Sequence, residues 1–404
     1  MIDEIDRRLD EIRDRGLMRR MRLISGPQGP RVLLDGQPVL LLCSNNYLGL
    51  ADHPRVREAA AEAALRYGAG AGASRLVSGT MRIHRRLEER LADFEGSEAA
   101  LLFGSGYLAN LGVISALARP EDVVFSDRLN HASIIDGCRL SGAESFVYDH
   151  LDADQLAWGL RQAGERGKVI VTDGVFSMDG DVAPLVEIAE LAQRFGALLV
   201  VDEAHGLGTT GPDGRGAAAA AGVEEAVDVT IGTLGKALGS YGAYVCCERR
   251  MTRYLVNTAR SLIFSTALPP PAVGAAMAGL ELLREQPRRV EKLQRNARVL
   301  REALRAEGLT APGEDTPIVP LVIGGPDAAV GAAEKALSEG VFAQSIRPPT
   351  VPEGTSRLRL SVMASHTKSE LREAARTLAA AVPKLPAAAA PPRSGIFDHL
   401  ADAA

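Results

Sequence analysis

Two residues near the middle of the chain have side chains that could together serve an aromatic aldehyde cofactor. Asp202 opens the segment DEAHGLGTTG (202–211), and Lys236 lies in GTLGKALG (232–239). A carboxylate at the end of a strand can keep a pyridine nitrogen protonated, and a lysine amine can form a Schiff base with an aldehyde. The pair therefore predicts a protein that binds pyridoxal phosphate (PLP).

Other polar residues follow the predicted strands of the same region. Asp127 and His131 come after the apolar run DVVF. Ser177 follows KVIVTDGVF, and His205 follows ALLVV together with Asp202. Ligands of open α/β sheets collect at the carboxyl ends of the strands. We therefore expect these residues to lie around one site.

Short apolar runs alternate with amphipathic or Ala-rich segments through the middle of the chain. Continuous apolar strands between helices indicate a mostly parallel sheet that is covered on both faces. We predict a large α/β domain over residues 46–285 and a smaller α+β C-terminal domain over 286–383. An N-terminal helical arm with short strands is expected over 1–45, and the Ala/Pro-rich residues 384–404 are expected to form a disordered tail.

The segment FGSGYLAN (103–110) places Gly104 and Gly106 between a strand and a helix. Backbone N–H groups at such a helix start can cradle a phosphate, although a glycine pair alone is more often a structural turn. Thr233, three residues before Lys236, either offers a hydroxyl to the same phosphate or caps a strand end. The glycine pair gains support only from the neighbouring motifs, and for Thr233 taken alone the strand-end cap is favoured.

Two histidines and two arginines are further candidates. His131 begins a predicted helix and could stack on a planar ring, although a lone histidine is more often a satisfied polar residue. His205 has better support, because it follows the strand-end acid by three residues. Arg359, in RLRLSV, points either to solvent or to a substrate carboxylate, which arginine binds in bidentate fashion. For Arg357 we expect a solvated strand edge.

Composition excludes several classes of protein. The chain has 404 residues, a net charge of −5 and only 4% aromatic residues, which argues against a nucleic-acid surface. Its four cysteines have no CxxC spacing and no nearby histidine pair, so we expect no metal site and a reducing, cytoplasmic location. The apolar stretch 266–283 contains three prolines, so a buried helix is expected there and no membrane span.

Seven segments extend the pattern along the chain: CSNNYLGL, GASRLVSGT, SDRLNHASIIDG, TDGVFSMDGDVAPL, VVDEAHGLGTTG, GTLGKALG and IRPPTVPEGTSRLRLS. The ordered set resembles the α-oxoamine synthases over residues 17–382. The resemblance implies the aspartate-aminotransferase-like fold of PLP-dependent transferases (fold type I). SRLVSGTMRIH and IRPPTVP are most similar to the biotin-pathway branch, which condenses L-alanine with a pimeloyl thioester of CoA or acyl-carrier protein.

The resemblance also implies roles for individual residues. Lys236 would be the Schiff-base lysine, Asp202 the partner of the ring nitrogen and His131 the stacking residue. The phenolic oxygen would be bound by His205 and Ser177, and the phosphate by Gly106, Tyr107 and Thr233. The amino-acid carboxylate would be bound by Asn45 and Arg359. The acyl-thioester path would include Thr350 and Arg19, which Arg20 or Arg22 replaces if the alignment shifts. A homodimer with shared active sites is implied, in which Ser78, Gly79 and Thr266 reach the cofactor of the neighbouring subunit.

Alternatives from other classes are weaker. DEAH also occurs in helicases, but a phosphate loop needs GxxxxGK followed by Ser or Thr, whereas Thr230 stands at the first glycine position and Ala237 follows the lysine. A catalytically silent scaffold of the same fold would lack Lys236. Within the enzymes, a branch that acetylates glycine from acetyl-CoA and branches with longer acyl chains stay open, because one methyl group changes binding by only about 1–3 kcal/mol.

Overall fold

The computed structural model describes residues 2–313 and 316–383. The segment 384–404, for which a disordered tail is expected, lies outside the described residues. Among the helices of the described part, none is long and apolar enough to cross a membrane.

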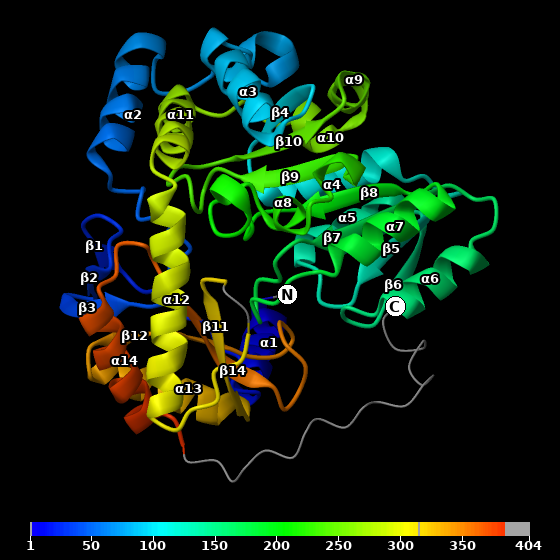
Figure 1. Cartoon of the computed structure of the whole chain (residues 1–404). Coiled ribbons are helices and arrows are strands. Elements are labelled where there is room, and N and C mark those ends of the chain that lie inside the picture. Colours follow the sequence, from blue (N-terminus) through cyan, green and yellow to red (C-terminus); the bar gives the residue numbers. More distant parts are fainter. Residues whose placement is uncertain (1, 314–315, 384–404) are drawn as a thin grey trace.

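A seven-stranded sheet forms the centre of the molecule (Figure 1). Its strands are β4 (Ala99–Phe103), β5 (Val123–Asp127), β6 (Glu144–Tyr148), β7 (Lys168–Asp173), β8 (Leu198–Asp202), β9 (Val229–Thr233) and β10 (Ala243–Cys247). They lie in the order β4-β10-β9-β8-β7-β5-β6, and only β10 runs antiparallel to its neighbours. The expected mostly parallel α/β fold is therefore confirmed.

Helices cover both faces of this sheet, and alternate strand residues face opposite sides. On β5, Val124 packs in one apolar cluster with Val113 and Ile134. Its neighbours Val123 and Phe125 pack in a second cluster on the other face. The helices of the large region are α2 (Pro54–Tyr67), α3 (Arg82–Glu95), α4 (Gly106–Leu117), α5 (Ala132–Ser141), α6 (Ala153–Gln162), α7 (Leu185–Phe195), α8 (Ala217–Ala221), α9 (Arg249–Thr258), α10 (Arg260–Ile263) and α11 (Pro270–Glu285), with the short π-helix η1 (Arg75–Gly79) and the short 3-10 helices η2 (Pro212–Gly214) and η3 (Glu224–Ala226).

The remaining elements form a smaller unit below the central sheet in Figure 1. It contains the C-terminal elements α12 (Arg288–Ala306), β11 (Ile318–Gly324), α13 (Pro326–Ser338), β12 (Val341–Phe342), β13 (Gln344–Ile346), β14 (Ser356–Ser361) and α14 (Lys368–Ala381). It also contains the N-terminal elements α1 (Ile2–Asp14), β1 (Ile24–Ser25), β2 (Arg31–Leu34) and β3 (Gln37–Leu41). The two sets are joined because β3 pairs in parallel with β12.

The solvated strand edge expected for Arg357 is wrong. In the three-stranded sheet β11-β14-β13, β14 is the central strand, so both of its sides are covered. The Arg357 residue is 5% exposed. Its guanidinium forms an ion pair with Asp179, which lies in the large region.

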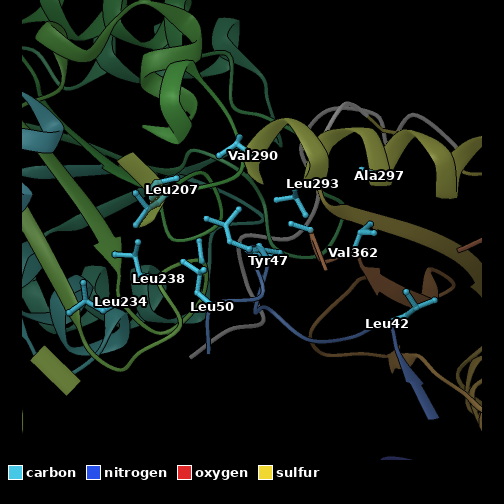
Figure 2. Close-up of a cluster of buried hydrophobic side chains, with 14 of the residues drawn as sticks. Leu42, Tyr47, Leu50, Leu207, Leu234, Leu238, Val290, Leu293, Ala297 and Val362 are labelled. Atoms are coloured by element: carbon cyan, nitrogen blue, oxygen red, sulfur yellow. The ribbon is translucent and has the colours of Figure 1, made fainter. Parts of the chain in front are cut away.

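One hydrophobic cluster connects the two regions (Figure 2). It combines residues of the N-terminal segment, of the loops after β8 and β9, of α12 and of β14; the labelled members include Leu42, Tyr47, Leu50, Leu207, Leu234, Leu238, Val290, Leu293, Ala297 and Val362. Tyr47 is fully buried in it. Because interiors are close-packed, this shared core fixes the N-terminal segment 42–50 against the loop that carries Lys236.

Candidate active site

A cavity of about 170 Å³ opens at the carboxyl ends of the central strands. We call it the strand-end cavity; it is lined by Gly106, Tyr107, Asn110, His131, Ser133, Asp173, Asp202, Ala204, His205, Thr233 and Lys236. Parallel strands end at the same edge of a sheet, so residues far apart in sequence meet there. All of the eight predicted cofactor residues except Ser177 line the cavity.

Lys236 lies three residues after the end of β9. Its Nζ is 2.7 Å from Nε2 of His205. Burial disfavours the charged ammonium and lowers the pKa of Lys236 to about 8, although Asp202 and Asp173 act in the opposite direction. About a tenth of Lys236 is therefore a neutral amine at pH 7, which is the form that attacks an aldehyde.

Asp202 is the last residue of β8 and is 3% exposed. The side-chain amide of Asn110 donates to Oδ2 at 2.6 Å, and the backbone N–H of Ala204 donates to Oδ1 at 2.8 Å. These bonds hold the carboxylate at a fixed position in the cavity wall. A carboxylate held there can stabilise a positive charge on a bound ring.

Asp173 ends β7 and is the register partner of Asp202 on the neighbouring strand. Its Oδ2 accepts the backbone N–H of His131 at 2.7 Å. Burial, and then the negative charge of Asp202, raise the pKa of Asp173 well above its ordinary value. Because two adjacent buried carboxylates do not both ionise readily, this upward shift favours the protonated form of Asp173.

The tautomer of His131 follows from its neighbours. Its Nδ1 accepts the backbone N–H of Ser133 at 3.3 Å and lies 2.7 Å from the Ser133 hydroxyl. Burial lowers the pKa of His131, and the charge of Lys236 acts in the same direction. A neutral ring whose Nδ1 accepts carries its proton on Nε2. Ser133 in turn accepts from Asn110 at 2.9 Å, so one chain of hydrogen bonds links His131 to Asp202.

His205 connects the lysine to the smaller unit. Its Nδ1 is 2.6 Å from the hydroxyl of Tyr47. That hydroxyl also contacts Asn45 Oδ1 at 3.2 Å and Nη2 of Arg359 at 3.4 Å. Burial, and then the charge of Lys236, hold the pKa of His205 well below its usual range, so the imidazole is neutral.

Arg359 and Asn45 are brought together as the sequence predicts. Nη1 of Arg359 donates to Asn45 Oδ1 at 3.2 Å and to Ser361 at 2.9 Å. Its Nε donates to the backbone carbonyl of Ser177. Ser177 therefore lies beside Arg359, whereas its predicted role at the phenolic oxygen of the cofactor stays untested.

The predicted phosphate residues lie at the start of α4 and the end of β9. Ser105 caps α4 by accepting the N–H of Leu108 at 3.2 Å. The first N–H groups of a helix have no intrahelical acceptor, so those of Gly106 and Tyr107 are suited to an anion. A Cβ at Gly106 would meet open space, which agrees with its position on the cavity wall. The Tyr107 hydroxyl donates to Asp136, and Thr233 donates to the Gly242 carbonyl at 3.2 Å.

Arg19 and Thr350 line a second, larger cavity of about 580 Å³. We call it the arginine-lined cavity; its wall includes Arg19, Arg20, Arg22 and Arg347 together with Leu34, Val330, Leu337, Phe342 and Thr350. Among the described residues, the two cavities share no lining residue. The structure therefore separates Arg19 and Thr350 from the group around Lys236.

Ser78, Gly79 and Thr266 also lie outside the strand-end cavity. Ser78 and Gly79 end the short π-helix η1, and Thr266 pairs with Ser74 beside it through an isolated β-bridge. Ser78 and Thr266 are exposed, whereas Gly79 is buried. Their expected contact with a neighbouring subunit stays a prediction.

Four polar residues in or beside the strand-end cavity were not predicted: Tyr47, Asn110, Ser133 and Asp173. Asp173 ends a strand, so the rule that identified Asp202 would have found it. Asn110 lies one helical turn after Gly106 and thus faces the same side of α4. Tyr47 has no sequence signal of this kind, because only the packing of distant segments brings it to His205.

Comparison with known proteins first identifies the protein family. A sequence model of the family described as "Aminotransferase class I and II" matches residues 37–378. The chain therefore belongs to the aminotransferase class I and II family. Solved structures that it resembles include a serine palmitoyltransferase from S. paucimobilis bound to PLP and myriocin, with a TM-score of 0.89 and 33% identity over 94% of this chain and 96% of that one.

Individual relatives then indicate the branch of this family that the chain resembles. The chain is 53% identical over 375 residues to the 8-amino-7-oxononanoate synthase of Geobacter metallireducens, covering 92% of this chain and 96% of the relative. It is 50% identical over 394 residues to that of Anaeromyxobacter dehalogenans, covering 98% and 99%. A solved synthase of the same name from Francisella tularensis has a TM-score of 0.74 and 28% identity over 85% and 97%. The resemblance to the α-oxoamine synthases is thus confirmed.

Proposed function

We propose that this chain is a PLP-dependent acyltransferase that condenses L-alanine with a pimeloyl thioester, forming 8-amino-7-oxononanoate, CO2 and a free thiol in biotin biosynthesis. The names of relatives that match over nine tenths of the chain support this reaction. The observation that carries it is the meeting of Lys236 and Asp202 in the wall of one cavity. The rival reaction with glycine and acetyl-CoA has no comparable support.

The strand-end cavity fits PLP in the chemistry of its donors. Lys236 supplies a partly neutral amine for the aldehyde, Asp202 a carboxylate for the ring nitrogen, and the α4 start at Gly106 an anion site. His131, from the loop before α5, lines the same cavity. When bound, the cofactor supplies an electron sink for the bonds at the substrate Cα.

Lys236 also has the properties of a general base. Its pKa of about 8 lies near the operating pH, where Brønsted behaviour makes proton transfer most efficient. The neutral His205 at 2.7 Å can accept a hydrogen bond from the lysine and orient its lone pair. We infer that Lys236 removes the α-proton of L-alanine and that His205 holds it in place.

Arg359 and Asn45 are the proposed anchor for the alanine carboxylate. Arg359 is 7% exposed, and no acidic side chain of the described residues forms an ion pair with it. Its guanidinium is instead held by neutral groups: the Ser177 carbonyl, Asn45, Ser361 and Tyr47. The positive charge of a buried arginine with only neutral partners is not balanced by a carboxylate of the protein, so the arginine can pair with an anionic ligand.

The arginine-lined cavity is the proposed path of the acyl thioester, whose carrier is CoA or acyl-carrier protein and is anionic in both cases. The structure favours Arg19 over its neighbours for this role. Arg20 and Arg22 each lie within 4.0 Å of Asp35, and Arg22 also pairs with Glu334. Arg19 is exposed and, among the described residues, forms no ion pair.

We also propose that the active enzyme is a homodimer with Ser78, Gly79 and Thr266 near the neighbouring active site. Beside Ser78 on η1, the apolar side chains Leu76 and Val77 are 53% and 80% exposed. Adjacent exposed apolar residues of this kind are typical of an interface.

The deciding experiment supplies the purified, PLP-loaded protein with one amino acid and one acyl-CoA at a time and identifies the products by mass spectrometry. We expect 8-amino-7-oxononanoate from L-alanine with pimeloyl-CoA. Glycine with acetyl-CoA, and serine with palmitoyl-CoA, are the matched alternatives. Preferred turnover of either alternative pair, with none from alanine and pimeloyl-CoA, would reject the proposed reaction.

A further inference from the structure

His150 lies outside the strand-end cavity, and each of its two ring nitrogens contacts a carboxylate oxygen. Its Nδ1 is 2.9 Å from Oδ1 of Asp127, and its Nε2 is 2.7 Å from Oδ2 of Asp181. A carboxylate oxygen accepts hydrogen bonds, so each ring nitrogen is placed to donate one. The geometry therefore selects the doubly protonated imidazolium, between two carboxylates.

The two carboxylates belong to different parts of the large region. Asp127 ends β5, is 2% exposed, and accepts the backbone N–H groups of Leu129 at 2.8 Å and Leu151 at 2.9 Å. It is therefore a fixed point of the sheet. Asp181 lies in the segment that follows β7, residues 174–183, which we call the Ser177 loop.

The Ser177 loop closes on itself. The N–H of Phe176 donates to the Asp181 carbonyl at 2.9 Å, and the N–H of Ala183 donates to the Gly174 carbonyl at 3.1 Å. The His150 ring packs edge-on against Phe176, with centroids 4.5 Å apart. His150 thus contacts the loop through both an ion pair and an aromatic ring.

The opposite side of the Ser177 loop contacts the smaller unit. Arg359 donates to the Ser177 carbonyl, and Arg357 forms an ion pair with Asp179. The hydroxyl of Thr316 donates to the Gly180 carbonyl at 2.6 Å. A displacement of the loop relative to the sheet would therefore move the supports of Arg359.

We propose that His150 is a positioning residue: it latches the Ser177 loop to the end of β5 and so sets the position of Arg359 for the substrate carboxylate. The inference rests on the proposed function, because it uses the proposed role of Arg359. It predicts that His150 acts on the binding of the amino acid and not on that of the acyl thioester, whose cavity it does not line.

The charges around His150 support this contact between the loop and the sheet. We call the ion pairs of His150 with Asp127 and Asp181 the His150 latch. Asp127 faces it from β5, Asp181 and Asp179 face it from the loop, and Arg357 faces Asp179 from β14. Burial alone would lower the pKa of His150, but the hydrogen bonds and charges of Asp127 and Asp181 outweigh it and raise the pKa to about 9. The ring is therefore charged, and the latch closed, at neutral pH.

The test compares His150→Gln, Asp181→Asn and the double variant with the wild-type holoenzyme. We expect KM for L-alanine to rise by about ten- to hundredfold in each single variant, since small misplacements of a binding group have effects of this size. In the double variant, KM for L-alanine should rise no further than in the more affected single variant, because both substitutions break the same contact. KM for pimeloyl-CoA should change by less than about twofold.

Arg128→Gln is the matched control, because it removes the exposed ion pair to Asp149 next to the latch and should leave both KM values unchanged. Hydrogen–deuterium exchange of peptides that cover 174–183 gives a readout independent of turnover, and faster exchange is expected in His150→Gln. Should alanine not be a substrate of the wild type, the proposed function fails while the exchange result still tests the latch. Equal changes in both KM values, or unchanged exchange of the loop, would overturn the latch; if His150→Gln does not fold, Asp181→Asn decides by the same criteria.

Discussion

The strand-end cavity and the arginine-lined cavity differ in how the chain builds them. The first lies where β7, β8 and β9 end, and buried carboxylates, histidines and a lysine with a lowered pKa line it. The second is more than three times as large and lies between the N-terminal segment, α13 and the strands β12 and β13. The sheet fixes the groups that perform chemistry, whereas the segments outside it shape the cavity for the variable acyl substrate.

The largest effect is expected at the centre of the strand-end cavity. Lys236→Ala should abolish turnover, because no other described lysine lines that cavity. It should also abolish covalent retention of PLP, measured as the added mass after borohydride reduction. Lys168→Ala, at the start of β7, is the control and should retain both. Added mass on Lys236→Ala would contradict the assignment.

Asp202→Asn should have the next largest effect. The variant keeps the shape of the side chain but removes its charge, and losing one preorganised electrostatic partner commonly lowers kcat by about 100- to 1000-fold. The loss should appear in the exchange of the alanine α-proton with deuterated solvent, followed by NMR. Asp154→Asn, exposed on α6, controls for the loss of one acidic residue. An unchanged exchange rate would remove Asp202 from the reaction.

A smaller effect, and one that separates the two cavities, is expected at the N-terminus. Arg19→Gln should raise KM for pimeloyl-CoA by about tenfold and leave KM for L-alanine unchanged, because a charged hydrogen bond contributes roughly 1.5–3 kcal/mol when it is made. Arg20→Gln should change KM by less than about twofold, since its guanidinium already lies near Asp35. The reverse order of effects would assign the substrate contact to Arg20.

The same contrast explains how much could be predicted from the sequence. Asp202, His205 and His131 follow apolar strands, and one local rule places them at one edge of the sheet. Tyr47 could not be predicted, because its contact with His205 depends on a core that joins α12, β14 and two loops of the large region. Arg357 was misassigned for a related reason: alternation along RLRLSV gives the face of a residue, but not the strands β11 and β13 that cover β14.

The smallest expected effect concerns stability and the His150 latch. The pKa of His150 is raised from 6.5 to about 9, so its contribution to stability is fully present below about pH 6.5 and is lost as pH rises through about 9. Wild-type holoenzyme should therefore melt roughly 2 °C above His150→Gln at about pH 7, and the difference should disappear near pH 10. Differential scanning calorimetry across this range measures the gap, with Arg128→Gln as the control whose gap stays constant. A gap that does not depend on pH would mean that packing against Phe176, and not the charge, holds the loop in place.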